Sequence, residues 1–518
     1  MKTKQQKLRI TALLIFTVLF NFLFWQEKPG INYAIYILPI LGLMIMLKPT
    51  RLKNIKVALT LAGTLLSLGA IILLNSSLSI WMCFISLVLF VGFYYQDRLE
   101  SIYYGISASV VSFVSTLFVF KKSLDESTKE SPVKLRSFKK LKLVIIPILI
   151  TAVFFLIYSN ANPIIAEYSS IVFEKIGNAF GDFFENFSFA RIMFVVLGLW
   201  ISSFFLFFKN QDDLATLEES QNNTISRLGL KLRFRLTKNT SSSFNLISLF
   251  NEYRTALLTL ILLNLLILLV NTIDVYKVWF NFSFEKGMNL SEELHSGTYL
   301  LILSILLSIG VIVYFFRGNI NFLQKNKPLK IMAYVWIVQN FILAITVVVK
   351  CMYYINFHGL AYKRIGVLMF LAVVFFGLVI MLVKINKQKS VFYLLRKGTW
   401  FAYLLLCVAA LINWDAAIIK TNINHQYPEN IDYSFLVDLS DKSLPILLNN
   451  MDNIEAHDEY CIRNHKVNAH FYGKTLTSII EKRIMQFNQK QHDNSWLSWN
   501  YADHKTAATL KLITNQEN

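Results

Sequence analysis

The sequence has few charged residues for its length. Only 16% of its 518 residues are Asp, Glu, Lys or Arg, whereas 55% are hydrophobic and the mean hydropathy is +0.48. Soluble chains carry about 25% charged residues. The missing charge leaves uncharged runs that are long enough to cross a bilayer. The composition therefore predicts a membrane protein and excludes most soluble enzymes, secreted disulfide scaffolds and disordered tail proteins.

Cysteines and catalytic motifs are also scarce. The four cysteines (Cys83, Cys351, Cys407 and Cys461) are scattered, so they predict neither a disulfide framework nor a CxxC zinc knuckle. The sequence contains no GxxxxGK[ST], GxGxxG, HExxH or GxSxG pattern. Nucleotide hydrolysis, dinucleotide redox chemistry and the common hydrolase mechanisms therefore lack support. We expect no cofactor, and the sequence favours a protein that is not an enzyme.

Positive charge is present, but its distribution is informative. The formal net charge is +19, yet from Thr421 onward nine Lys and Arg stand against twelve Asp and Glu. The basic excess lies earlier, in short segments between apolar runs, where positive charge sets membrane topology. We therefore expect no nucleic-acid partner.

Twelve apolar runs are candidate membrane spans. A basic stretch before the first run resembles a signal peptide, but a second run follows at once, which predicts a retained helical hairpin. The runs occupy about 10–25, 31–47, 57–74, 78–95, 102–120, 143–158, 191–208, 255–271, 298–316, 331–349, 366–383 and 398–413.

Charge tests whether all twelve runs cross. If they do, with the N-terminus inside, connections holding 24 Lys and Arg face outward, against about 7 in the competing connections. One early run therefore does not cross, and the Ser-rich run at 101–120 is the weakest, as a re-entrant or buried helix. The alternative is twelve spans that break the charge rule. Eleven spans place the N-terminus in the cytoplasm and the C-terminal tail outside a bacterial cytoplasmic (inner) membrane.

These patterns predict an all-α, polytopic transmembrane helix bundle with a small helical extramembrane domain at the C-terminus. In the polar stretch at 209–253, residues 228–236 alternate between apolar and basic side chains, which predicts a strand or an extended segment on anionic lipid. In the tail, Leu476 to Phe487 predicts an amphipathic helix, and Trp496, Trp499 and Tyr501 are expected to dock a helix at 503–513. The expected divisions are N-terminal membrane helices at 1–120, membrane helices at 121–208 with an interfacial amphipathic helix at 164–189, a polar basic cytoplasmic loop at 209–253, a membrane core at 254–413 and an exported tail domain at 414–518.

Several stretches from Tyr253 onward carry a resemblance to a known family. They include "YRTALLTLILLNLLILLVNTIDVYKVW" at 253–279, "WIVQN" at 336–340, "YINFHGLAYKRIGV" at 354–367, "NWDAAI" at 413–418 and "LVDLSDKSLPILL" at 436–448. The chain resembles an uncharacterised family of bacterial multipass membrane proteins, a domain-of-unknown-function family. The resemblance implies location and topology rather than chemistry.

Polar residues inside apolar spans are candidate site residues, because their burial in a membrane is unfavourable. The sequence offers Asn264, Asn271, Gln339 and Asn340. Hydrogen bonds between helices are the alternative explanation of such amides.

A second set of polar residues lies at the expected outer ends of the late spans. Lys363 and Arg364 are positive on a side that should be poor in positive charge, and Asp274 or Asp415 could supply a carboxylate partner. Because an Arg guanidinium binds carboxylate or phosphate through two hydrogen bonds, we expect an outward-facing anion or lipid-headgroup site that also includes His295. The alternative is a structural ion pair between helix ends.

Three tail residues, His457, Cys461 and His465, recur every four residues and would share one face of a helix. Imidazole and thiolate suit a zinc-like ion. An ordinary polar helix surface gives the same pattern, and no second ligand cluster accompanies it.

Three classes of function remain open. A scaffold or sensor that couples the exported tail to a protein partner comes first, because the tail is discrete and catalytic motifs are missing. A transporter or lipid-handling protein comes second, and a membrane-embedded enzyme third. Membrane lipids are expected partners in each case, and the sequence leaves the oligomeric state open.

Overall fold

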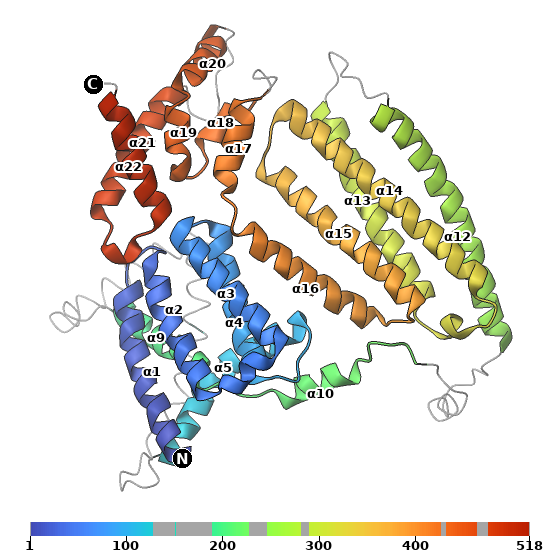
Figure 1. The fold of residues 1–518 in the computed structure, drawn as a ribbon, viewed down its shortest axis with the longest axis horizontal. Coiled ribbons are helices and arrows are strands. Elements are labelled where there is room, and N and C mark those ends of the chain that lie inside the picture. The colour runs from blue at the N-terminus through green and yellow to red at the C-terminus, as the bar shows by residue number, and fades with distance from the viewer. Residues whose placement is uncertain are drawn as a thin grey trace. The chain divides into compact units, whose positions relative to one another are not determined.

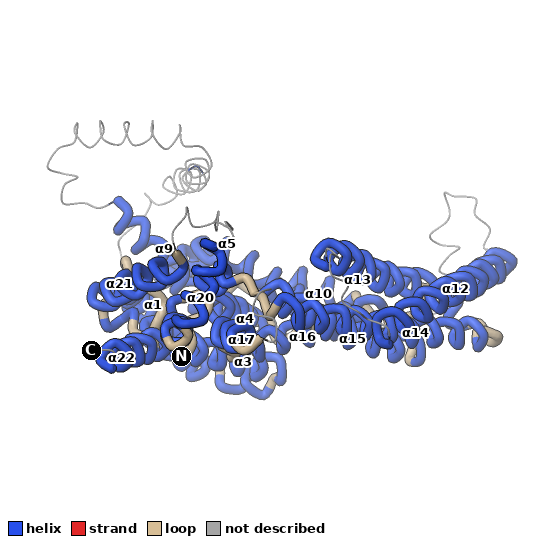
Figure 2. Tube along the Cα trace, turned by 90° about the horizontal axis from the view of Figure 1, so that it is seen from above, coloured by secondary structure: helices blue, strands red, loops and turns tan. Residues whose placement is uncertain are grey.

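The secondary structure is helical throughout the described part of the chain. The computed structural model describes residues 2–127, 151, 189–226, 246–280, 290–425, 431–463 and 475–516. Within these ranges the β contact is confined to an isolated bridge between Thr224 and Lys389. Figure 2 shows the helices and the loops that connect them. The predicted all-α class is confirmed.

The apolar helices match the predicted runs. Eight of those described are long and apolar enough to cross a bilayer, and the apolar parts of three more are shorter. Eleven predicted runs are therefore helices, and the run at 143–158 lies outside the described residues except for position 151. The long helices are α1 (Lys2–Phe24), α3 (Ile55–Leu73), α4 (Ser77–Tyr95), α9 (Phe189–Leu206), α12 (Leu246–Asp274), α14 (Lys327–His358), α15 (Tyr362–Asn386) and α16 (Val391–Ala409), and the three others are α2 (Ile31–Leu47), α5 (Ile102–Ser127) and α13 (Leu290–Phe315) (Figure 1).

Several helices extend beyond the predicted runs, and α16 and α12 are examples. α16 begins about two turns earlier than the predicted run, because the Ser390 side chain accepts a hydrogen bond from the Tyr393 N–H and caps the helix there. α12 begins at Leu246, before the expected start of the membrane core. It continues into a π-helical turn, η2 (Val275–Phe280). Apolar patterning marks the membrane-facing part of a helix, whereas the helix itself extends to its capping residues.

The packing divides the chain into two compact units. The first contains residues 1–28, 32–49 and 110–210, and the second contains 29–31, 50–109 and 211–518. In the first unit α1 packs on α9, where a Cβ at Gly198 would lie only 2.7 Å from the Phe20 ring. The Tyr36 hydroxyl of α2 forms a hydrogen bond of 2.9 Å with Ser202 of α9. The domain ranges expected from the sequence stay predictions.

In the second unit, α3 and α4 form a helical hairpin, and α16 packs on both. Asn54 caps α3 and Ser76 caps α4 through their side chains. α12, α13 and α14 pack as a group around a core that includes Leu260, Ile312 and Trp336. α15 lies between α14 and α16 and joins this group to the rest of the unit (Figure 1).

Short segments tie the connections at one end of these helices. The buried carboxylate of Glu218, in α10 (Asp212–Ser220), accepts hydrogen bonds from the backbone N–H groups of Glu100 (3.0 Å) and Ser101 (2.7 Å), directly before α5. It thus satisfies donors at a helix N-terminus. Arg51 pairs with Asp97, in the α4–α5 connection. Two further turns at these connections are η1 (Pro49–Lys53) and η3 (Asn319–Phe322).

The C-terminal tail folds as short helices around its own apolar core. The predicted amphipathic helix is α21 (Leu476–Asp493), which buries Leu476, Ile480 and Phe487 against Leu436 and Ile454. The other elements are α17 (Trp414–Ile423), α18 (Tyr433–Val437), η5 (Asp441–Ser443), α19 (Leu444–Leu448), α20 (Met451–Arg463), η7 (Trp496–Ser498) and α22 (Tyr501–Gln516).

Among the described contacts, the expected aromatic docking of the last helix is limited to one ring contact, in which the centres of the Trp499 and His504 rings lie 6.1 Å apart. Trp496, Trp499 and Tyr501 are 64%, 41% and 46% exposed. α22 instead buries Thr506 and Leu510 and packs against α19, η5 and α3. The contact of α22 with the tail is therefore made mainly by the few positions on its inner face.

Two predicted segments cannot be compared with the structure. The amphipathic helix expected at 164–189 lies outside the described residues except for its last position, and so does the extended segment expected at 228–236. The polar loop expected at 209–253 is described only at its ends, where α10 and the first turns of α12 lie.

Candidate functional site

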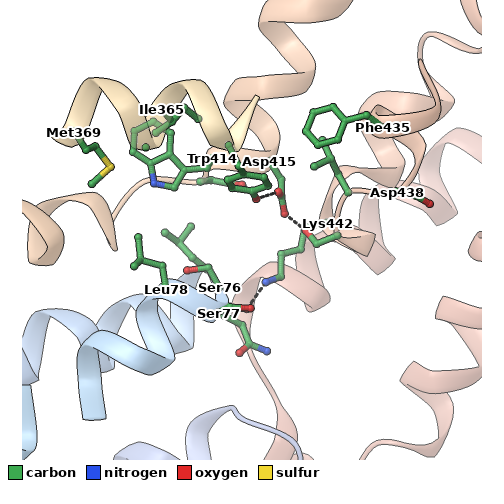
Figure 3. Close-up of a pocket in the computed structure, with 17 residues that line it drawn as sticks. Ser76, Ser77, Leu78, Ile365, Met369, Trp414, Asp415, Phe435, Asp438 and Lys442 are labelled. Carbon is green, nitrogen blue, oxygen red and sulfur yellow. Dashed lines mark hydrogen bonds between the residues drawn. The ribbon is translucent and has the colours of Figure 1, made fainter. Parts of the chain in front are cut away.

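A cavity of about 630 Å³ lies where the tail meets the ends of the membrane helices (Figure 3). Three parts of the second unit form it: the α3–α4 turn, the N-terminal turns of α15, and the tail from α17 to η5. Its lining residues are Leu74, Asn75, Ser76, Ser77, Leu78, Tyr362, Ile365, Gly366, Met369, Asn413, Trp414, Asp415, Phe435, Asp438, Leu439, Ser440 and Lys442.

Backbone conformation exposes polar groups at one wall of the cavity. Asn75 has a φ of 46°, in the left-handed region that Asn tolerates. This residue reverses the chain between α3 and α4, and Ser76 then caps α4. The Asn75 side chain donates to the Pro29 carbonyl at 3.1 Å, while its own oxygen is buried without a hydrogen-bond partner in the described structure. The turn therefore presents the Asn75 backbone carbonyl to the cavity, where Lys442 binds it.

Asp415 connects three elements at the opposite wall. It lies in the first turn of α17, which begins where the Asn413 side chain accepts a hydrogen bond of 3.2 Å from the Ala416 N–H. Its carboxylate accepts hydrogen bonds from the hydroxyls of Tyr362, at the start of α15, and Ser440, before η5. Asp415 thereby holds the tail to the membrane helix.

Lys442 supplies the positive charge of the cavity. Its side chain crosses from η5 toward the α3–α4 turn, where the ammonium donates a hydrogen bond to the Asn75 carbonyl (Figure 3). Burial lowers the pKa of Lys442, and the carboxylates of Asp503, Asp415 and Asp441 oppose that effect. Because the buried Lys442 ammonium has lost part of its hydration, a ligand that offers it a hydrogen-bond acceptor would stabilise its charged form.

Arg483 of α21 holds the backbone that carries Lys442. Its guanidinium donates to the carbonyls of Val437 and Leu439 and pairs with Asp441 at 2.6 Å. A planar guanidinium that binds three acceptors holds the backbone segment that carries them in one position. These contacts hold the η5 turn, which carries Lys442, to α21.

The remaining walls are apolar. Aliphatic and aromatic side chains line the side of the cavity nearest α3, α4 and α15, away from Lys442, as Figure 3 shows for Leu78, Ile365, Met369 and Trp414. The cavity thus combines an apolar wall with a polar end, which suits an amphiphile. The described lining residues include no histidine. These residues therefore do not form a carboxylate–imidazole pair, which is one arrangement that supports general acid–base catalysis.

The carboxylate partners expected for Lys363 and Arg364 are wrong. Asp274 pairs with Lys350 of α14 at 3.2 Å, and both side chains are largely buried. Asp415 binds the two hydroxyls described above. Within the described residues, neither Lys363 nor Arg364 forms an ion pair, and Lys363 is exposed. The ion pair of Asp274 and Lys350 links α12 to α14, and it includes neither Lys363 nor Arg364.

Arg364 caps the end of α14 instead. Its guanidinium donates to the carbonyls of His358, at 2.9 Å, and Gly359, and it lies 4.2 Å from the centre of the Tyr354 ring. The last carbonyls of a helix lack partners within the helix and attract a cation. The positive charge that topology left unexplained has a structural role, and Arg364 does not line the cavity.

The buried amides join α12 to α14. The Asn264 side chain donates to the Met332 carbonyl at 3.0 Å and accepts from the Gln339 amide at 2.7 Å, and Asn271 donates to the Gln339 carbonyl at 3.0 Å. Asn340 donates to the Trp336 carbonyl of its own helix at 2.8 Å. Hydrogen bonding therefore accounts for Asn264, Asn271 and Gln339 as contacts between helices.

A second cavity, of about 360 Å³, lies among α12, α13 and α14. Aliphatic residues, Trp336 and two serines line it, and neither Asn264 nor Asn340 does. It offers no charged group. The role of Asn264 and Asn340 as site residues stays a prediction.

The remaining predicted residues are not brought together. His295 lies in α13, but its side chain is outside the described residues, as are the side chain of Cys461 and all of His465. His457 of α20 packs on the Tyr433 ring, with ring centres 4.5 Å apart. Within the described residues no group of three His, Cys, Asp or Glu could hold a metal ion. The metal site stays a prediction.

The sequence did not identify Asn75, Tyr362, Ser440 and Lys442 as site residues. Three of them lie in stretches that carried the resemblance: Tyr362 lies in "YINFHGLAYKRIGV", and Ser440 and Lys442 lie in "LVDLSDKSLPILL". Asn75 gave only the signal of an Asn between two apolar runs, which indicates a turn.

The comparisons with known proteins fit this location. The family described as "Domain of unknown function (DUF4153)" matches residues 60–450. The match confirms the resemblance to a domain-of-unknown-function family. It begins earlier than the motifs from Tyr253 onward, and it includes every residue that lines the 630 Å³ cavity. Neither the curated proteins nor the solved structures gave a match.

Proposed function

Because the chain belongs to the family described as Domain of unknown function (DUF4153), its activity has to be argued from its own site, and we propose that it is a multipass membrane protein that binds a lipid in the cavity between α3–α4, α15 and the tail. The observation that carries this proposal is the division of the cavity into an apolar wall and a polar end. Lipids have the same division.

The location supports the proposal. α3, α4 and α15 are long apolar helices, so the cavity lies at their ends, where a bilayer has its headgroups. Acyl chains would follow the side of Leu78 and Met369 into the bilayer, and the headgroup would lie against Lys442 and Asn75. A volume of about 630 Å³ accommodates a headgroup with the first part of its chains.

A sensor role is a second candidate, and one contact favours it. Asp415 joins α15 to the tail across the cavity, so an occupant touches both a membrane helix and the tail. A bound lipid would thereby change how firmly the tail is held. A protein partner that reads the tail belongs to this second candidate.

The lipid proposal is tested with a filled cavity. Gly366 lines the cavity, and a Cβ added there meets nothing within 4 Å, so Gly366→Trp places a ring in the cavity without displacing the backbone. Gly377→Trp is the matched control, because it is equally unobstructed on α15 but does not line the cavity. Full-length proteins are purified in mild detergent, and bound lipid is counted by native mass spectrometry. We expect wild type and Gly377→Trp to retain lipid and Gly366→Trp to lose it; equal retention by all three refutes the proposal.

We also propose the orientation that charge predicts, with the N-terminus in the cytoplasm and the tail outside the inner membrane. Exposed Lys387, in the α15–α16 connection, and exposed Asn449, in the tail, lie at opposite ends of α16. Cysteines introduced at each position are labelled in intact cells with an impermeant maleimide, with the unmodified protein as background. Labelling of Asn449→Cys but not Lys387→Cys supports this orientation, and the reverse contradicts it.

A further inference from the structure

The charged groups of the cavity are unequal in number. Lys442 is the only cation among its described lining residues, whereas Asp415 and Asp438 are carboxylates. Two more carboxylates, Asp441 and Asp503, act on Lys442 from outside the lining. Asp441 is neutralised by Arg483 at 2.6 Å, but Asp503 binds only the neutral Asn500 amide, at 2.7 Å, among the contacts described. The polar end therefore carries more negative than positive charge.

The hydrogen-bonding groups are unequal in the same direction. Asp438, at the end of α18, is an exposed lining residue at the rim of the cavity, and its carboxylate has no described side-chain partner. Asp415 keeps acceptor capacity beyond its two hydroxyl donors. On the donor side, the Lys442 ammonium uses one of its three hydrogens on the Asn75 carbonyl.

A ligand that complements this end must both donate and accept. A headgroup with only negative charge would satisfy Lys442 but would meet the surplus of carboxylates, and like charges that are brought together disfavour binding. A quaternary ammonium carries positive charge but has no N–H to donate. A primary ammonium next to a phosphate provides both: N–H donors for the carboxylates, and phosphate oxygens for Lys442.

We propose that the cavity selects a headgroup in which a phosphate is joined to a primary amine, as in a phosphoethanolamine lipid. The proposal rests on the lipid-binding function argued above and specifies its headgroup. The amine lies toward Asp438 and Asp415, and the phosphate lies toward Lys442. Asp438 is then a specificity residue, because it is exposed and takes no part in the contacts that hold the tail.

The test compares three dioleoyl lipids that differ only in headgroup. Full-length wild type in mild detergent is loaded with equimolar phosphatidylethanolamine, phosphatidylcholine and phosphatidylglycerol, and the retained lipids are quantified by native mass spectrometry. We expect phosphatidylethanolamine to exceed each of the others about tenfold, the ratio that one charged hydrogen bond of about 1.4 kcal/mol provides. Equal retention of the three, or a preference for phosphatidylglycerol, overturns the headgroup inference.

Two variants assign the preference to this cavity. Asp438→Asn removes a carboxylate and is expected to lower the ratio of phosphatidylethanolamine to phosphatidylglycerol about threefold or more; an unchanged ratio removes Asp438 from the inference. Lys442→Met is expected to weaken retention of phosphatidylethanolamine and phosphatidylglycerol alike, since both carry a phosphate. Equal retention by wild type and Lys442→Met contradicts a phosphate at Lys442.

Failure of the headgroup inference is distinguishable from failure of lipid binding. If Gly366→Trp loses lipid but wild type shows no headgroup preference, lipid binding stands and the inference fails. If Gly366→Trp keeps its lipid with the same preference, the preferred lipid binds elsewhere and both fail. Free O-phosphoethanolamine is a third arm: if it alone protects wild type but not Lys442→Met from thermal unfolding, the headgroup chemistry stands and the ligand is a soluble molecule.

Discussion

Gly359 is the residue whose replacement we expect to loosen the tail most directly. It ends α14 with φ 78° and ψ −176°, a conformation that is essentially restricted to glycine. A Cβ at this position would lie 2.5 Å from the side-chain oxygen of Asn422, in α17 of the tail. That oxygen accepts the Leu360 N–H at 2.6 Å, and the Asn422 amide donates to the Leu360 carbonyl at 2.9 Å. Gly359→Ala therefore strains the backbone and displaces the tail residue that satisfies both polar groups of Leu360.

The size of the effect follows from these contacts. The backbone conformation costs about 1–3 kcal/mol for a residue with a side chain, and displacing Asn422 leaves buried polar groups that cost about 1–3 kcal/mol each. Because the site relaxes in part, we take about 3 kcal/mol as the expected loss of local stability in α17, which corresponds to roughly a hundredfold more frequent opening.

Hydrogen–deuterium exchange of the full-length protein in detergent measures that opening directly. Amides of α17 in Gly359→Ala should exchange about a hundredfold faster than in wild type, while those of α12 keep their rates. Gly377→Ala is the control, since it adds a methyl group to α15 where nothing lies within 4 Å. Rates in α17 that stay within about threefold of wild type would refute both the strain argument and the role of Asn422 as the link between α17 and the α14–α15 connection.

Three further changes test other contacts. Arg364→Gln removes the cation that caps α14 and should lower thermal stability while leaving lipid retention unchanged, because Arg364 does not line the cavity; lost retention with normal stability would restore it as a site residue. Gln339→Leu should cost no more than about 2 kcal/mol in chemical unfolding, and adding Asn264→Leu should recover part of it because the orphaned acceptor is then gone; additive losses would contradict a direct bond. Burial lowers the pKa of His457 more than Asp458 and Asp432 raise it, so the stability that its neutral form contributes is present above pH 6.5 and is lost as the pH falls toward the lowered pKa. His457→Phe should therefore flatten the curve of unfolding free energy against pH in this range. Parallel curves for wild type and variant between pH 7 and 5 would exclude His457 as the cause.

The helices could be predicted because their signal is local. Each residue of a membrane-spanning helix contributes to its hydropathy, so the position of the helix can be predicted from a short window of sequence, as for α3 and α15. The ends were less accurate where a single capping group decides them, as Ser390 does for α16.

The cavity could not be predicted because its polar residues are distant along the chain. Lys442 binds the carbonyl of Asn75, which is 367 positions away in the chain. That acceptor is a backbone atom, which every residue has, so the residue type does not indicate it. The same limitation affected Arg364. Counting charges suggested an aspartate partner, whereas the acceptors are carbonyls at a helix end, which every helix has and no side-chain pattern shows.

The contact between Glu218 and Ser101 spans 117 positions and has a consequence for the order of synthesis. When α5 leaves the ribosome, the carboxylate that completes its first turn has not yet been made, and neither has α9, which lies between the two in the chain. The start of α5 therefore reaches its final hydrogen bonding only after α9 and α10 have been translated. Insertion of the early helices and closure of this contact are separate events, and a ribosome halted between residues 127 and 218 would carry α5 with its N-terminal amides still open to solvent or translocon.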